Sequence, residues 1–104
     1  MQVINLDEYA QFREDGYNLR LLHDSPNWRI MNFNFEAGQE LPVHSHDVES
    51  EVMILVLTGE GYFTGGESEI EAKSGSMLIS KVDEPHGIKA TTRMRVLVAI
   101  APPI

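Results

Sequence analysis

The sequence contains no cysteine, and this absence excludes several kinds of site at once. Disulfides, thiolate zinc sites and catalytic thiols all need a cysteine sulfur. Basic residues are also scarce, because 8 Lys and Arg stand against 16 Asp and Glu and give a formal net charge of −8. Binding to nucleic-acid phosphates or to anionic membranes depends chiefly on Lys and Arg. The composition therefore argues against nucleic acid and membrane surfaces as partners.

Long apolar runs are missing as well. No run approaches the roughly 18 residues that a membrane-spanning helix needs. Residues 1–8 are neither basic nor continuously apolar, so they do not resemble a secretory signal peptide. We therefore expect a cytoplasmic protein. A chain of 104 residues has room for one hydrophobic core, which predicts a single domain over residues 1–104.

Long helical patterns are absent too, and short apolar stretches separated by glycine turns take their place. The stretch 28–35 alternates, with Met31, Phe33 and Phe35 on one face of the expected strand. Gly65-Gly66 is a two-residue hairpin signal, and residues 2–6 are expected to form a short edge strand. About nine to ten strands with turns every 8–12 residues are typical of an antiparallel sandwich or barrel. The predicted fold class is all-β.

Residues 52–57 are the most hydrophobic stretch, and all six are apolar. An antiparallel strand with one face in water should alternate between apolar and polar residues. Both faces of this strand are therefore expected to be covered. The barrel interior covers one face, and a second subunit or another segment of the chain covers the other. We predict a homodimer.

Three histidines and a carboxylate carry the chemistry that this sequence suggests. His44 and His46 are two residues apart, so their side chains share one face of an extended strand. Glu51 leads into the apolar stretch 52–57, and His86 directly follows Pro85. Imidazole and carboxylate groups together suit a divalent transition metal.

The spacing of these residues resembles the two sequence motifs of the cupin family. The first motif, residues 38–59, consists of Gly38, five residues, His44-x-His46, four residues, Glu51, and then Gly59. The second, residues 75–90, begins at Gly75 and contains Pro85-His86 ten positions later. It departs from the usual family pattern at Lys81, Asp83 and Ala90. The resemblance implies a single-domain jelly-roll β-barrel.

The same resemblance implies His44, His46, Glu51 and His86 as metal ligands. Seven residues separate Glu51 from Gly59, where cupins usually have six. With rigid spacing Val52 would take the ligand position, because a shift of one residue turns every side chain to the other face. A β-bulge, or a turn lengthened by a polar residue before Gly59, would keep Glu51 inside, and we favour the longer turn. Glu49 is the competing carboxylate, and we favour Glu51 over it.

A site of three imidazoles and one carboxylate leaves one or two positions open on iron, manganese, nickel or zinc. An open position admits substrate, water or oxygen. The resemblance is therefore compatible with a metal-dependent dioxygenase, isomerase or lyase acting on a small polar organic molecule. The alternative, which we rank second, is a non-catalytic module that binds a small molecule or holds the metal. One barrel hosts many chemistries in this family, so the sequence does not decide between the two classes.

Overall fold

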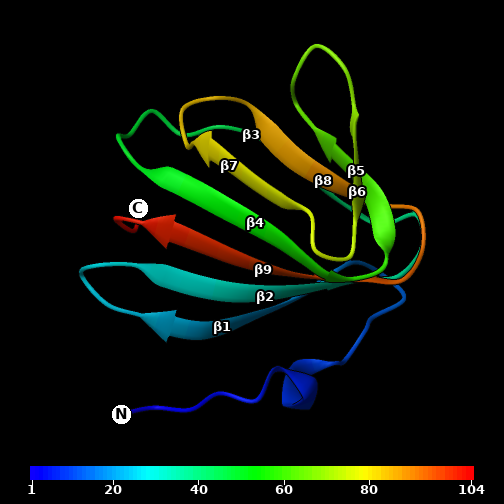
Figure 1. Ribbon diagram of the computed structural model, residues 1–104, viewed down its shortest axis with the longest axis horizontal. Coiled ribbons are helices and arrows are strands. Elements are labelled where there is room, and N and C mark those ends of the chain that lie inside the picture. Colours follow the sequence, from blue (N-terminus) through cyan, green and yellow to red (C-terminus); the bar gives the residue numbers. More distant parts are fainter.

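The computed structural model describes residues 1–104 and contains two antiparallel sheets that pack face to face (Figure 1). The larger sheet has the strand order β1-β2-β9-β4-β7, and the smaller has the order β3-β8-β5-β6. The nine strands are β1 (Asn18–Asp24), β2 (Arg29–Phe35), β3 (Glu40–His44), β4 (Glu51–Thr58), β5 (Glu60–Thr64), β6 (Ile70–Lys73), β7 (Met77–Lys81), β8 (His86–Ala90) and β9 (Met94–Ala101). The predicted all-β jelly roll is confirmed, although the two sheets do not close into one continuous barrel.

The hydrophobic core lies between the sheets and follows from the alternation along each strand. On β4, Val52, Ile54 and Val56 are buried, whereas the residues between them are partly exposed. The neighbouring strand β9 presents Val96 and Val98 to the same side, because they pair directly with Val56 and Ile54. Burying a Val or Ile side chain contributes roughly 1.5–3 kcal/mol. These matched inward rows therefore hold the two sheets together.

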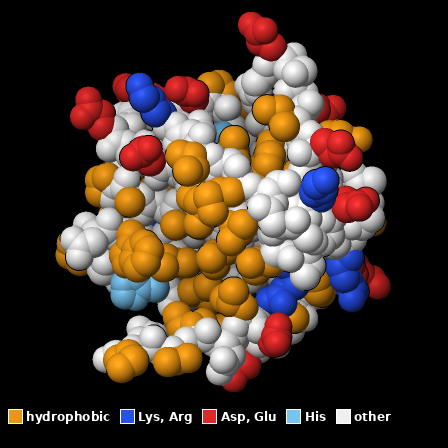
Figure 2. Space-filling view, viewed as in Figure 1, with side chains coloured by type: hydrophobic (Ala, Val, Ile, Leu, Met, Phe, Trp, Pro, Cys, Tyr) orange, Lys and Arg blue, Asp and Glu red, His pale blue; other side chains and the backbone are white.

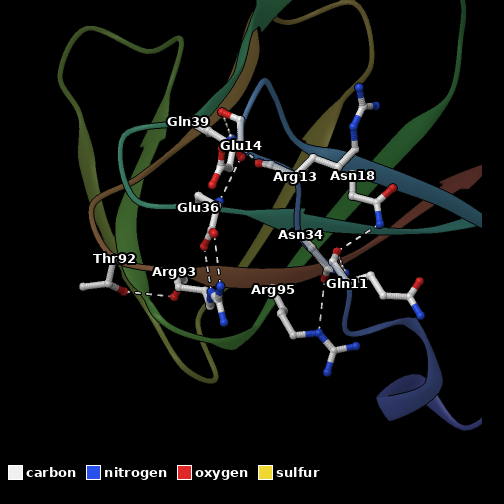
Figure 3. A network of polar contacts seen from close by, with 10 residues as sticks. All are labelled: Gln11, Arg13, Glu14, Asn18, Asn34, Glu36, Gln39, Thr92, Arg93 and Arg95. Carbon is white, nitrogen blue, oxygen red and sulfur yellow. Dashed lines mark hydrogen bonds and ion pairs between the residues drawn. The ribbon is translucent and has the colours of Figure 1, made fainter.

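The N-terminal segment differs from the prediction. Residues 2–6 form no strand, and the short 3-10 helix η1 (Leu6–Tyr9) begins at the end of this range. The segment is held instead by polar side chains of the larger sheet: Asn34 donates to the main-chain oxygens of Tyr9 and Gln11, and Arg95 donates to that of Leu6. Figure 3 shows Asn34 between Gln11 and Arg95. The predicted edge strand is therefore wrong: residues 2–6 pair with no strand, and the chain from Leu6 to Gln11 is attached to the larger sheet through side chains.

The outer face of the larger sheet is unusually apolar. Figure 2 shows hydrophobic side chains gathered in the middle of the view, over the strands that Figure 1 labels β4, β9 and β2. Cross-strand pairing places Ile79, Met53 and Ala99 in one row and Met77, Leu55 and Leu97 in the next. Ile79 is 65% exposed and Met77 is 53% exposed. The expected two-sided apolar strand is therefore present: the inner residues of β4 are buried, and its outer residues Met53 and Leu55 stay partly exposed.

No helix in the structure is both long enough and apolar enough to cross a membrane. The cytoplasmic location stays a prediction.

Candidate metal centre

Two of the predicted histidines are brought together by strand pairing. His44 ends β3 and His86 begins β8, and the two residues are direct partners in the antiparallel ladder. Directly opposed residues point to the same face of a sheet. Their ring centroids are 4.5 Å apart. Residues from the two separate sequence motifs thus form one imidazole pair on the smaller sheet.

A glycine allows the chain to pack closely beside this pair. Gly87 follows His86 and lies where β8 contacts both β3 and β5. A Cβ atom at this position would lie 2.7 Å from the main-chain oxygen of Leu41 and 2.8 Å from Oγ1 of Thr64. Any larger residue would push the strands apart at the point where the two imidazoles meet. Gly87 therefore helps to position the pair.

Hydrogen bonds fix the tautomer of both rings. Nδ1 of His44 lies 2.8 Å from the carbonyl oxygen of Pro42, and Nδ1 of His86 lies 2.7 Å from that of Glu84. A carbonyl oxygen only accepts hydrogen bonds, so each Nδ1 must carry the proton. The neutral rings therefore keep the lone pair on Nε2. Metal-binding histidines in proteins are oriented in the same way, by a hydrogen bond from the other ring nitrogen.

His46 completes the cluster from the loop after β3. Its ring centroid lies 5.5 Å from that of His44, with the two rings nearly perpendicular. The main-chain N–H of His46 donates to the carbonyl oxygen of Val82 over 3.0 Å, which ties this loop to the segment before β8. The His46 side chain is exposed, whereas His86 is only 5% exposed. The cluster thus has one buried ring, one partly buried ring and one at the surface.

Burial also changes the proton affinity of His86. Desolvation is the main cause that lowers the pKa of this imidazole below its ordinary value. Repulsion from His44 and His46 lowers the pKa further, and the hydrogen bond to the carbonyl of Glu84 opposes the shift. His86 therefore remains neutral to lower pH than a solvated histidine. A neutral imidazole is the form that binds metals.

The three histidines line one end of a cavity of about 200 Å³ between the sheets. The remaining wall is mostly apolar and comes from the inward rows of the larger sheet. Its lining residues are Arg29, Met31, Phe33, Leu41, Val52, Ile54, Val98, Ile100 and Ile104. The cavity thus combines imidazole nitrogens with a mostly apolar wall, an arrangement typical of small-molecule sites.

Glu51, the predicted fourth ligand, does not lie in this cavity. Val52 is 2% exposed and lines the cavity, while Glu51 is exposed and faces a separate surface cavity. Pairing along β4 runs without a break from Glu51 to Val56, and the bulge follows only between Val56 and Thr58. The strand therefore starts with Glu51 pointing outward, and neither the longer turn nor the bulge reverses it. Glu49 lines the same surface cavity as Glu51.

Arg29 was not predicted as a site residue from the sequence, although the alternation of residues 28–35 places it on the same face as Met31. It lies two residues before Met31 and so belongs to the inward face of β2. In the ladder it pairs with Ile100, which in turn pairs with Val52. Arg29 is the only Lys, Arg, Asp or Glu that lines the histidine cavity.

In the geometry of this structure, no group of three or more His, Asp or Glu side chains is already arranged to hold an ion. The donor set nevertheless suits a borderline transition metal, because two rings present free Nε2 lone pairs and a third lies beside them. The His46 side chain makes no hydrogen bond that would stop its ring from turning.

Comparison with known proteins identifies the family. The family model for the cupin domain matches residues 31–100, which contain the whole cavity except Arg29 and Ile104. This chain belongs to the cupin family. Proteins of this family commonly bind metals. No curated protein matches the sequence.

Solved structures agree with this assignment. An RmlC-like cupin protein from Desulfovibrio desulfuricans is 48% identical, with a TM-score of 0.95 over 100% of this chain and 99% of its own. TT1209 from Thermus thermophilus is 23% identical, with a TM-score of 0.88 over 98% of each chain. Ectoine synthase from P. lautus is 22% identical, with a TM-score of 0.76 over 100% of this chain and 80% of its own. The last two show a shared fold.

Proposed function

We propose that this cupin binds one divalent transition metal through His44, His46 and His86 and uses the adjoining cavity for a small organic molecule. The observation that carries the proposal is the pair of Nδ1–H bonds to main-chain carbonyls, which leaves Nε2 of His44 and His86 free. Such bonds orient ligand histidines and fix their tautomer. The lowered pKa of His86 supports the same role, because protons compete less well for that nitrogen.

Iron, manganese, nickel and zinc all accept imidazole ligands, and the proposed ion is one of these four. With three neutral ligands, such an ion keeps its full positive charge and open positions, and it would supply Lewis acidity toward a bound oxygen atom. The residues of the chain have other tasks. Apolar side chains from β2, β4 and β9 exclude water from the cavity, and the hydrogen-bonded rings keep their orientation while a ligand enters.

Two classes of activity fit this site. One is a metal-dependent dioxygenase, isomerase or lyase that acts on a small polar molecule, and ectoine synthase, which shares the fold, is by its name an enzyme. The other is a non-catalytic module that binds a small molecule or holds the metal. The lining favours the second class in one respect: besides the three histidines, no side chain that could act as a general base at neutral pH lines the cavity.

The test is elemental analysis of protein purified without a histidine tag, followed by dialysis and re-addition of each metal. We expect one equivalent of metal per chain. Iron or manganese in the purified protein would favour the oxygen-dependent or redox activities. Protein that contains no metal and takes up none of the four would overturn the proposal.

We further propose that a second copy of the chain covers the outer face of the larger sheet and forms a homodimer. Met53, Leu55, Met77 and Ile79 form neighbouring rows there, and such an apolar face is self-complementary across a two-fold axis. Light scattering should give twice the 11.7 kDa of one chain. Leu55→Lys should give the monomer mass.

Ile70→Lys is the matched control for the dimer, because Ile70 is 59% exposed on the smaller sheet, away from this face. It should leave the dimer intact. A wild-type mass of one chain at micromolar concentration would contradict the dimer but not the metal site.

A further inference from the structure

Arg29 is the one permanently charged side chain in the lining of the histidine cavity, and its surroundings prepare it for an anion. Its Nε lies 3.3 Å from Oδ1 of Asp24 and its Nη2 lies 3.5 Å from Oδ2, so one edge of the guanidinium is held by a carboxylate. The Arg29 side chain is 30% exposed. A guanidinium held on one edge has already lost much of its rotational freedom before a ligand arrives.

The other end of the guanidinium faces the cavity. Nη1 of Arg29 donates to the main-chain oxygen of Ile104 over 2.9 Å, and Ile104 itself lines the cavity. Three of the five guanidinium N–H groups are therefore used, and two remain. The Ile104 oxygen marks a position where an acceptor already meets this arginine. The guanidinium already makes this hydrogen bond charge-assisted, and a ligand carboxylate that takes the place of the Ile104 oxygen would bring its own negative charge to the same donor.

The size and lining of the cavity define the rest of the ligand. A volume of about 200 Å³ lies below the range of roughly 300–1,000 Å³ that is usual for pockets of drug-sized ligands. Between Arg29 and the histidines the wall is formed by Val52, Ile100 and other aliphatic side chains. A suitable occupant thus has only a few carbon atoms, with an anionic group at one end.

We propose that Arg29 selects short-chain carboxylates: the carboxylate binds the guanidinium, the alkyl chain lies along the aliphatic wall, and the far end reaches the three imidazoles. This inference rests on the proposed function for its account of the far end. The recognition of the carboxylate depends only on Arg29. The missing inward carboxylate at Val52 agrees with it, since no Asp or Glu side chain lines the cavity and Asp24 is the one carboxylate paired with Arg29.

The experiment compares butyrate with its uncharged analogue butyramide, using methyl NMR of Val52, Ile54, Val98 and Ile100 with and without added Zn²⁺. We expect millimolar binding of butyrate and at least tenfold weaker binding of butyramide. Arg29→Gln should weaken butyrate binding by roughly 10–100-fold and abolish the preference. Arg29→Lys should be intermediate, because it keeps the charge but loses the planar fork.

Two further variants separate recognition from structure. Asp24→Asn should strengthen butyrate binding, because it removes the anion that competes for the guanidinium. If the Asp24–Arg29 pair served the fold alone, Asp24→Asn would lower the free energy of unfolding and leave butyrate binding unchanged. Arg20→Gln is the matched control, since Arg20 lies on the neighbouring strand β1 and outside the cavity, and should change nothing. If Arg29→Gln does not fold, Arg29→Lys and Asp24→Asn decide the question.

Equal binding of butyrate and butyramide to wild-type protein, or an unchanged preference in Arg29→Gln, would overturn the inference. Metal content measured on the same samples keeps the two proposals apart. Metal present without carboxylate preference refutes the role of Arg29 alone. Carboxylate preference in protein that never binds metal refutes the metal site alone.

Discussion

Two cavities lie near the first residues of β4, and one step along the strand separates their linings. The outer cavity, about 420 Å³, is lined by Glu51 together with Glu49, Lys81 and Asp83. The inner cavity, about 200 Å³, is lined by Val52 and the three histidines. Alternation along an extended strand sends Glu51 and Val52 to opposite faces. The larger cavity thus has the carboxylates, and the smaller has the imidazoles.

The difference between these cavities shows that size does not identify the functional site. Exposed carboxylates in an open surface hollow are well solvated and bind a divalent ion only weakly unless several converge. The imidazoles instead lie against apolar side chains, and main-chain carbonyls fix two of them. Preorganised nitrogen donors suit iron, manganese, nickel or zinc better than loose carboxylates do. This comparison supports the proposal that the metal binds in the smaller cavity.

The largest effect is expected from removing an inner-cavity ligand. His86→Ala should lower metal affinity by more than about 100-fold, since loss of a ligand exceeds the roughly 10–100-fold cost of removing a residue that only orients one. Metal content after dialysis measures this. His23→Ala is the control, because His23 lies beside Trp28 and outside the cluster. If His86→Ala retains one equivalent of metal, the inner cavity is not the site.

A second experiment moves the carboxylate across β4. Val52→Glu places a carboxylate among the histidines and should destabilise the metal-free protein by about 2–4 kcal/mol, because a charge is buried. Added metal should then raise the melting temperature more than in wild type. The metal binds only the folded state, and the fourth ligand makes that binding tighter. Val52→Gln, similar in shape but uncharged, is the control. A melting temperature that no metal raises would count against an inward ligand position.

The pH dependence of the metal-free protein is expected to be smaller and has a defined sign. The folded-state pKa of His86 is lowered, chiefly by burial, so the unfolded chain takes up a proton first as the pH falls. The contribution of His86 to the free energy of unfolding should be fully present above about pH 6.5, the pKa of an unfolded histidine. It should decrease as the pH falls from there to the folded-state pKa. Urea unfolding between pH 8 and pH 5 measures this. His86→Gln should flatten the curve; an unchanged curve would show that His86 is not responsible.

The smallest effects are expected in the outer cavity. Glu49→Ala and Glu51→Ala should each leave metal content unchanged and alter the free energy of unfolding by less than about 0.5 kcal/mol. Both side chains are exposed, and neither lines the inner cavity. Loss of metal in Glu51→Ala would instead support Glu51 as the fourth ligand, as the sequence resemblance implies.

The sequence was sufficient to predict the fold class and the proximity of the histidines. Glycine turns and alternating strands predicted the all-β architecture, and the resemblance to the two cupin motifs implied the cluster of His44, His46 and His86. The direction of Glu51 was not predictable in the same way. It depends on where a single bulge falls, and the structure has that bulge after Val56, too late to turn Glu51 inward.

Other features escaped the sequence because they depend on contacts between distant segments. Asn32 and Asn34 alternate with Met31, Phe33 and Phe35 and so belong to the opposite face of their strand, yet both are fully buried. The N-terminal segment covers them, and Asn34 donates to its main-chain oxygens. Arg29 lay on the predicted inward face, but its hydrogen bonds to Asp24 and Ile104 join residues that no local pattern connects. Alternation along a strand predicts which side chains share a face. It does not predict which distant segment of the chain covers that face.

The most direct test of the metal site is the location of the ion itself. A crystal of the protein soaked with Mn²⁺ or Zn²⁺, measured at the absorption edge, gives an anomalous peak wherever the metal binds. We expect one peak per chain within coordination distance of His44, His46 and His86, with no protein carboxylate among the ligands. A peak in the outer cavity at Glu49, Glu51 or Asp83, and none among the histidines, would contradict the account.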